Sequence, residues 1–216
     1  GKTSSHASMI CGVGGFAWQG AKVAVLCNEE SVARVSSRYL TAATGMSMQQ
    51  IRNDRKKATE QWAQVKQNLM FADGTGKDMH WVEAVTKSYK PDILVLDMGD
   101  KFASKGSHSR EDQKLKDCAI HARQIAKEYD CAVFYMSQLS ASAEGKVVVD
   151  QSMMEGSRTG KAAEADLMLL ISKNPDIEGL GEEDPQRHIT VAKNKVTGWH
   201  GRVTCEIDPD TARFTA

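Results

Sequence analysis

The sequence lacks an excess of either charge and any long apolar run. Its 216 residues include 28 Lys and Arg against 28 Asp and Glu, so the formal net charge is zero. This balance argues against a simple polybasic nucleic-acid coat and against an acidic tail protein. Uninterrupted apolar stretches such as 167–171 are far shorter than the roughly 20 residues that cross a bilayer. No signal-peptide core opens the chain, so we expect no membrane partner and a cytoplasmic location.

Paired cysteines and metal-binding clusters are also missing. The five cysteines occur without a Cys-x-x-Cys pair, and the six histidines are equally scattered. We therefore expect reduced thiols, mostly in the core, and no zinc site built by the protein. With 41% hydrophobic and 26% charged residues, the composition is that of an ordinary globular domain, which excludes disorder, collagen and a coiled coil.

Short apolar runs alternate with amphipathic stretches along most of the chain. The runs predict strands at 22–27, 69–72, 93–96, 132–137, 167–171, 189–193 and 203–207. Helical spacing of apolar residues predicts helices at 8–18, 31–44, 79–89 and 115–129, with one or two exposed helices in 48–67. Continuous apolar runs are typical of strands buried in a parallel sheet. We expect one α/β domain over 1–216, with a mainly parallel sheet flanked by helices and an antiparallel strand pair at the C-terminus.

The first residues, Gly1-Lys2-Thr3, match the end of the phosphate-binding pattern G-x-x-x-x-G-K-[ST]. A mature protein rarely starts on glycine, so we expect the chain to begin inside such a loop, with the earlier glycine and a strand upstream. A bare tripeptide also occurs by chance. The letters of 12–17 match G-x-G-x-x-A, but no predicted strand precedes them, so a Rossmann site there is not expected.

Acidic residues follow two of the predicted buried strands, at the edge where α/β sheets place their ligands. Asp97 follows 93–96 and could hold Mg²⁺, although an aspartate there also suits a turn. Glu29 and Glu30 follow 22–27, and one of them could polarise an attacking water. The alternative is an exposed first turn of a helix, where acidic side chains are favourable.

Polar residues also end two later strands. Gln138 follows 132–137 and could bond a γ-phosphate or its water, or simply end the strand. Lys193 and Lys195 are two residues apart, which places both on one face of a strand. There they could bind a ligand, or protect a sheet edge from aggregation. Between these strands, 140–161 is rich in Gly, Ser and charge, which predicts a long loop.

The order of these motifs resembles the RecA-like C-terminal motor domain of DnaB-type hexameric replicative helicases, including phage primase-helicases. The resemblance covers nearly the whole chain. Its most specific segments are Tyr135-Met136-Ser137-Gln138-Leu139, Glu164-Ala165-Asp166 with the apolar run after it, and Val191-Ala192-Lys193-Asn194-Lys195. It implies a P-loop NTPase core that uses ATP and Mg²⁺ and a location in a bacterial or phage-infected cytoplasm.

The resemblance also implies roles for individual residues. Glu29 would be the catalytic base, Gln138 the γ-phosphate sensor, and Thr3 and Asp97 the Mg²⁺ ligands. Lys195 would act across a subunit boundary, where the family normally has an arginine; lysine lacks the planar guanidinium fork. ATP would be bound by Gly1, Lys2, Thr3, Ser4 and Lys193, with Lys173 and Ile207 near the adenine.

The same resemblance implies a hexameric ring with single-stranded DNA in its channel, and primase and the replicative polymerase as further partners. The DNA-binding segments would be 101–109 and 140–158, with Lys146, Arg158 and Lys161 at DNA phosphates. A neutral chain can bind DNA this way, because six copies concentrate a few cations in one channel. The alternatives are a RecA- or KaiC-like ATPase of recombination or signalling, and a non-catalytic loader-type binding module.

Overall fold

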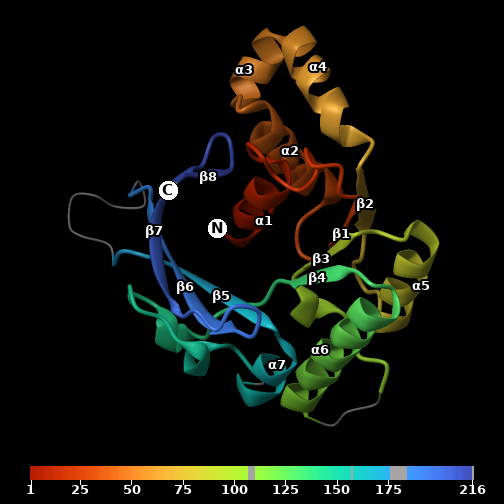
Figure 1. Ribbon diagram of the computed structural model, residues 1–216, viewed down its shortest axis with the longest axis vertical. Coiled ribbons are helices and arrows are strands. Elements are labelled where there is room, and N and C mark those ends of the chain that lie inside the picture. The colour runs from red at the N-terminus through yellow and green to blue at the C-terminus, as the bar shows by residue number, and fades with distance from the viewer. Residues whose placement is uncertain (107–109, 157, 176–183, 216) are drawn as a thin grey trace.

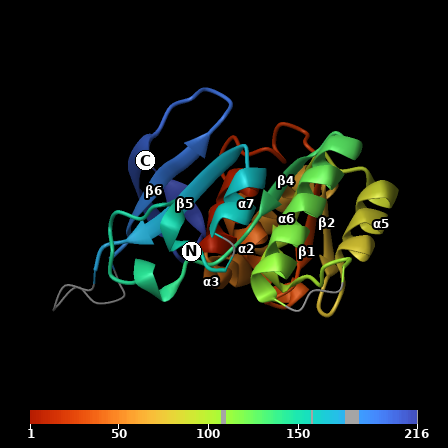
Figure 2. The ribbon, with the colours of Figure 1, turned by 90° about the horizontal axis from the view of Figure 1, so that it is seen from below.

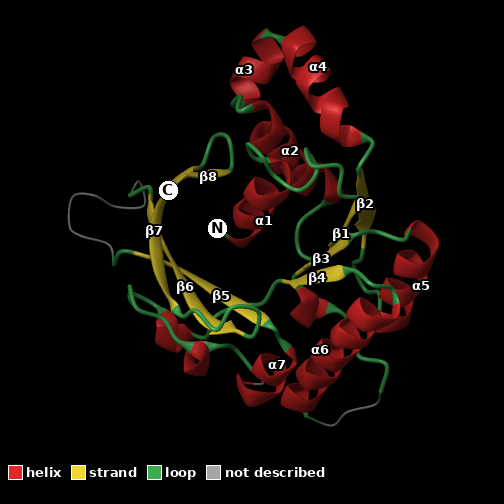
Figure 3. Ribbon diagram, in the orientation of Figure 1, coloured by secondary structure: helices red, strands yellow, loops and turns green. Residues whose placement is uncertain are grey.

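The computed structural model contains two four-stranded sheets (Figures 1 and 3). It describes residues 1–106, 110–156, 158–175 and 184–215. The first sheet is parallel, with the strand order β2-β1-β3-β4. Its strands are β1 (Val23–Cys27), β2 (Leu69–Asp73), β3 (Ile93–Asp97) and β4 (Ala132–Tyr135). The sequence prediction of a mainly parallel α/β core is therefore confirmed.

Helices cover both faces of the parallel sheet. The helices are α1 (Lys2–Cys11), α2 (Val32–Thr44), α3 (Met48–Asn53), α4 (Arg55–Lys66), α5 (Met79–Tyr89), α6 (Glu111–Glu128) and α7 (Arg158–Glu164). Alternate side chains of a strand point to opposite faces. Val23 and Val25 of β1 accordingly pack with α1 and α2, whereas Ala24 and Leu26 pack with α5 and α6. Both sets of side chains are fully buried, which explains the unbroken apolar sequence of β1.

The second sheet is antiparallel, in the order β5-β6-β7-β8, and Figure 2 shows it to one side of the parallel sheet. Its strands are β5 (Leu167–Lys173), β6 (Gln186–Asn194), β7 (Gly201–Asp208) and β8 (Arg213–Thr215). The expected C-terminal strand pair is thus part of a larger sheet that β5 and β8 complete. The short β8 is held by Arg213, whose Nε donates to the carbonyl oxygen of Ala42 in α2 at 2.8 Å.

Asp166, just before β5, connects the two halves of the fold. Its Oδ1 lies 3.1 Å from Nη1 of Arg123 in α6 and 3.3 Å from Nζ of Lys195 after β6. Partial burial opposes ionisation of Asp166, but the bonds from Lys195 and Arg123 outweigh it and lower the pKa of the carboxyl group. The carboxylate is therefore a charged link between the helical layer and the antiparallel sheet.

Two segments differ most from the sequence prediction. The helix expected at 8–18 is α1, which begins at Lys2 and ends at Cys11. The chain turns at Gly12 and adopts a left-handed backbone at Gly14 (φ 69°), so the apolar residues after it pack back on the helix instead of extending it. The loop expected at 140–161 contains the 3₁₀ turns η2 (Ala141–Ala143) and η3 (Gln151–Met153) and the start of α7.

Candidate nucleotide and catalytic site

The carboxyl ends of β1, β3 and β4 lie side by side. Cys27 pairs with Asp97 and Leu96 with Tyr135 in parallel register. Beyond the strands, the amide of Asn28 donates to the Asp97 carbonyl oxygen at 3.2 Å. The structure therefore places the segments that carry Glu29, Asp97 and Gln138 at one edge of the sheet, where α/β folds bind ligands.

Asp97 and α1 form the buried centre of this edge. The Asp97 side chain is 2% exposed, and its Oδ1 lies 3.5 Å from Nε2 of His6. The other ring nitrogen of His6 lies 2.8 Å from the hydroxyl of Tyr39 in α2. Thr3 precedes His6 by three residues, which places it on the same face of α1. The hydroxyl-bearing residue of the Gly-Lys-Thr motif is thus on the side of α1 that faces Asp97.

An unsatisfied oxygen marks Asp97 as a candidate metal-site residue. Oδ2 of Asp97 is buried and has no hydrogen-bond partner among the residues that the structure describes, and the same holds for Nε2 of His6. Buried polar atoms are nearly always bonded. A carboxylate oxygen that can accept from metal-bound water fits Mg²⁺, which keeps several waters and uses few protein ligands. The described residues contain no cluster of three His, Cys, Asp or Glu that could hold a metal by itself.

The two adjacent acids after β1 have different surroundings. Oε1 of Glu29 accepts from Nζ of Lys101 at 3.0 Å. Lys101 ends η1 (Gly99–Lys101), the turn that follows β3. Glu30 is instead held by two arginines of α2, Arg34 at 2.9 Å and Arg38 at 2.8 Å. Glu30 is therefore engaged in anchoring α2, which leaves Glu29 as the better candidate for a base.

A partly buried polar cluster lies next to Gln138. Asp100 of η1 accepts from the hydroxyls of Tyr135 and Ser137 and from Nζ of Lys161, the last at 3.0 Å. Nζ of Lys161 also donates to the Ser137 hydroxyl at 2.8 Å. Burial, followed by the Asp100 charge, raises the pKa of the Tyr135 hydroxyl. The cluster therefore links η1 and α7 to Ser137, the residue before Gln138.

This cluster gives Lys161 a different environment from the one expected of a DNA contact. Its side chain is 3% exposed, and its ammonium is held inside the fold by Asp100 and Ser137. In this arrangement the ammonium is not available to a DNA phosphate. A lysine is rarely buried without a charged partner, and the partner here lies 61 residues earlier in the sequence.

Lys193 and Lys195 both contact the residues that lead into β5. Nζ of Lys193 donates to the carbonyl oxygens of Ala162 and Ala163 in α7. Burial, followed by the charge of Lys195, lowers the pKa of Lys193. Lys195 lies one residue after the end of β6 and pairs with Asp166. Within one chain, neither ammonium lies beside Asp97 or Glu29 in any contact that the structure describes.

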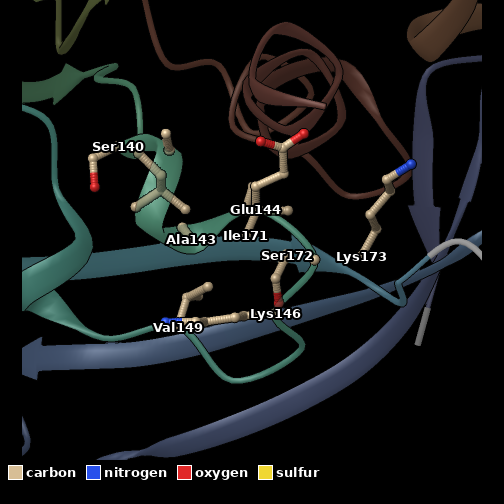
Figure 4. A pocket seen from close by; sticks show the side chains of 11 residues that line it. Ser140, Ala143, Glu144, Lys146, Val149, Ile171, Ser172 and Lys173 are labelled. Carbon is tan, nitrogen blue, oxygen red and sulfur yellow. The ribbon is translucent and has the colours of Figure 1, made fainter.

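The remaining candidates are dispersed. Lys146 and Lys173 line one open cavity of about 360 Å³ between 139–149 and β5 (Figure 4). Ile207 is buried in β7 and pairs with Phe214 of β8. Arg158 begins α7, but its side chain is not described. Residues 107–109 and 157 of the expected DNA-binding segments lie outside the described residues.

A match with a known protein family identifies the family of this chain. The model of the DnaB-like helicase C terminal domain matches residues 1–216. The chain belongs to this family. No match was found among curated proteins.

Two solved structures have the same fold as this DnaB-like domain. A structure described as a DnaB-like replicative helicase and its interactions with primase has a TM-score of 0.79 at 18% identity, covering 99% of this chain and 55% of that one. A second structure, described as an ATPase domain, has a TM-score of 0.74 at 18% identity, covering 99% of this chain and 80% of that one. The chain thus spans little more than half of the first helicase. Because the identity is only 18%, the two structures are evidence for the fold alone, which is the RecA-like fold of the DnaB-like domain.

Three residues of the site were not singled out from the sequence. The spacing between Thr3 and His6 could have identified His6, because residues three apart lie on the same face of a helix. Asp100 and Lys101 are adjacent opposite charges three and four residues after Asp97. Their partners, Lys161 and Glu29, are 61 and 72 residues away, so only the folded DnaB-like domain shows what they contact.

Proposed function

We propose that this chain is the ATP-driven motor of a replicative DNA helicase, which hydrolyses ATP at subunit interfaces and moves along single-stranded DNA. The family supports a helicase motor. The observation that carries the proposal is the edge of the parallel sheet, where the Asp97 carboxylate, buried with one oxygen unsatisfied, meets α1, the helix that contains Lys2 and Thr3. The proposed cofactors are ATP and Mg²⁺, and the proposed location is the cytoplasm.

The proposed hydrolysis assigns one task to each residue. Lys2 neutralises the β- and γ-phosphates, with Gly1 and Ser4 beside it, and Thr3 and Asp97 hold Mg²⁺. When bound, Mg²⁺ neutralises the charge that develops on the phosphate oxygens. Glu29 accepts the proton of the attacking water, and Gln138 bonds the γ-phosphate. Lys173 and Ile207 contact the adenine in this proposal.

The proposed assembly is a hexameric ring. Large apolar side chains are exposed on and beside the antiparallel sheet: Leu167, Leu169, Val196, Trp199 and Val203. Exposed large apolar side chains are common at protein interfaces, so the proposal places a subunit interface on this sheet. A neighbouring subunit on this sheet would bring its nucleotide towards Lys193 and Lys195. In the proposed ring, DNA is bound by Lys146 and Arg158, with primase and the replicative polymerase as partners of the whole protein.

Strand separation distinguishes the helicase from the alternatives. The full-length protein, given ATP and Mg²⁺, is expected to unwind a forked DNA duplex, measured as release of a labelled strand. A non-hydrolysable ATP analogue is the control and should release none. Hydrolysis without unwinding would favour the RecA- or KaiC-like ATPase. Nucleotide binding without hydrolysis would favour the loader-type module.

Lys195 provides a test of catalysis across the interface. Lys195→Ala is expected to lower ATP hydrolysis by the assembled protein at least about 10-fold, because a cation supplied in trans stabilises transition-state charge. Phosphate release is measured at a concentration where light scattering shows the oligomer intact. Asp166→Asn, which removes the partner of Lys195 within the chain, is the control. Normal hydrolysis by oligomeric Lys195→Ala would contradict the assignment.

A further inference from the structure

We propose that Lys101 is a positioning residue that keeps Glu29 from its water until single-stranded DNA binds. The inference rests on the proposed function, in which Glu29 is the base, and on the expectation from the sequence that the segment beginning at Lys101 contacts DNA. Its starting observation is the ion pair of 3.0 Å between Nζ of Lys101 and Oε1 of Glu29. While this pair is formed, that carboxylate oxygen accepts from an ammonium rather than from the attacking water.

The backbone that presents Lys101 is held in place. Met98, which precedes η1, has a left-handed backbone with φ 65°, a conformation rare outside glycine. The amide of Gly99 donates to the carbonyl oxygen of Met136 at 2.9 Å. A Cβ at Gly99 would lie 2.6 Å from the Tyr135 ring, so only glycine allows this approach. Asp100 is fixed by the partly buried cluster with Ser137 and Lys161. The turn is therefore fixed close to Gln138.

The side chains of the ion pair are exposed, in contrast to this backbone. Lys101 is 46% and Glu29 35% exposed. Ion pairs in water are weak and are screened by salt, so a competing anion can replace one partner. A DNA phosphate attracts lysine strongly because binding releases condensed counterions. DNA that binds the Lys101 ammonium would therefore free Glu29 at little cost.

The next lysine of the segment shows that this contact is specific to Lys101. Lys105 pairs with Glu83 of α5. Helix α5 packs on the same face of the parallel sheet as α6. Lys105 thus anchors the segment to α5, whereas Lys101 reaches the end of β1. Among the described residues of the segment, the geometry assigns to Lys101 the link with the proposed base.

The test compares Lys101→Met and Lys101→Arg in the full-length protein. ATP hydrolysis is measured without DNA and with saturating oligothymidylate. Lys101→Met is expected to raise kcat without DNA about 2- to 5-fold, with KM for ATP unchanged. This factor is the increase in the population of unpaired Glu29 that loss of an exposed ion pair can produce. Stimulation by DNA should fall by the same factor. Lys101→Arg, which keeps the ion pair, should retain the low rate without DNA, as should Lys66→Ala, an exposed lysine on the distant α4 (Figure 1).

An unchanged or lower rate without DNA in Lys101→Met would overturn the inference, and so would an equal rise in Lys101→Arg. Glu29→Gln separates this failure from failure of the proposed function. If Glu29→Gln is inactive and Lys101→Met behaves as wild type, only the role of Lys101 is wrong. If Glu29→Gln hydrolyses ATP normally, the catalytic assignment itself is wrong.

Discussion

Glu29→Gln is expected to lower DNA-stimulated ATP hydrolysis by the full-length protein about 10²- to 10⁴-fold, the contribution of a positioned general base. Glutamine has nearly the same shape but cannot accept the proton of the water. Glu29 follows β1 at the edge that Asp97 shares, and Lys101 is its partner in the structure. The measurement is steady-state phosphate release, with affinity for a fluorescent ATP analogue measured in parallel. Affinity should change little, because Glu29 is assigned to the water and not to the phosphates.

Glu30→Gln is the matched control for this prediction. Glu30 is the next residue, but its two carboxylate oxygens form ion pairs with Arg34 and Arg38. Its replacement should affect hydrolysis far less, and should destabilise the fold by no more than about 1 kcal/mol, because ion pairs near the surface contribute little. Loss of hydrolysis in Glu30→Gln with retention in Glu29→Gln would transfer the role of base to Glu30.

Lys161→Met is expected to destabilise the chain by about 3 kcal/mol, because it leaves Asp100, whose side chain is only 13% exposed, without its cation. Ser137 and Tyr135 would still donate to the carboxylate, so complete loss of folding is not expected. The measurement is urea unfolding at neutral pH, read as a lower midpoint with an unchanged slope.

Two further variants make this stability prediction specific. Lys195→Met breaks the exposed pair with Asp166 and should cost no more than about 1 kcal/mol. Asp100→Asn combined with Lys161→Met removes both charges and should recover part of the loss, since the sites are coupled. A cost for Lys161→Met no larger than that for Lys195→Met would show that the buried pair is not an important stabilising contact.

The sequence was sufficient to predict the parallel core. Ile93–Asp97 is buried at every position, so its apolar run and terminal Asp97 identified both the strand and the candidate metal-site residue. It was insufficient for Lys161, because a lysine in a stretch rich in Gly and Ser resembles an exposed one until its distant partner is known. Three strands of the antiparallel sheet were predicted, but its full extent of four strands was not, for a similar reason. Its shortest strand, β8, has only three residues and depends on long-range contacts of Arg213 with α2.

The pairing of Asp166 with Arg123 and Lys195 has a consequence for the response of the fold to salt. All three side chains are partly exposed, and attraction between such charges weakens as the Debye length falls from about 10 Å at 0.1 M salt to about 3 Å at 1 M. The apolar cores on the two faces of the parallel sheet have no such dependence. Concentrated salt should therefore loosen the connection between the two sheets before it weakens the parallel core.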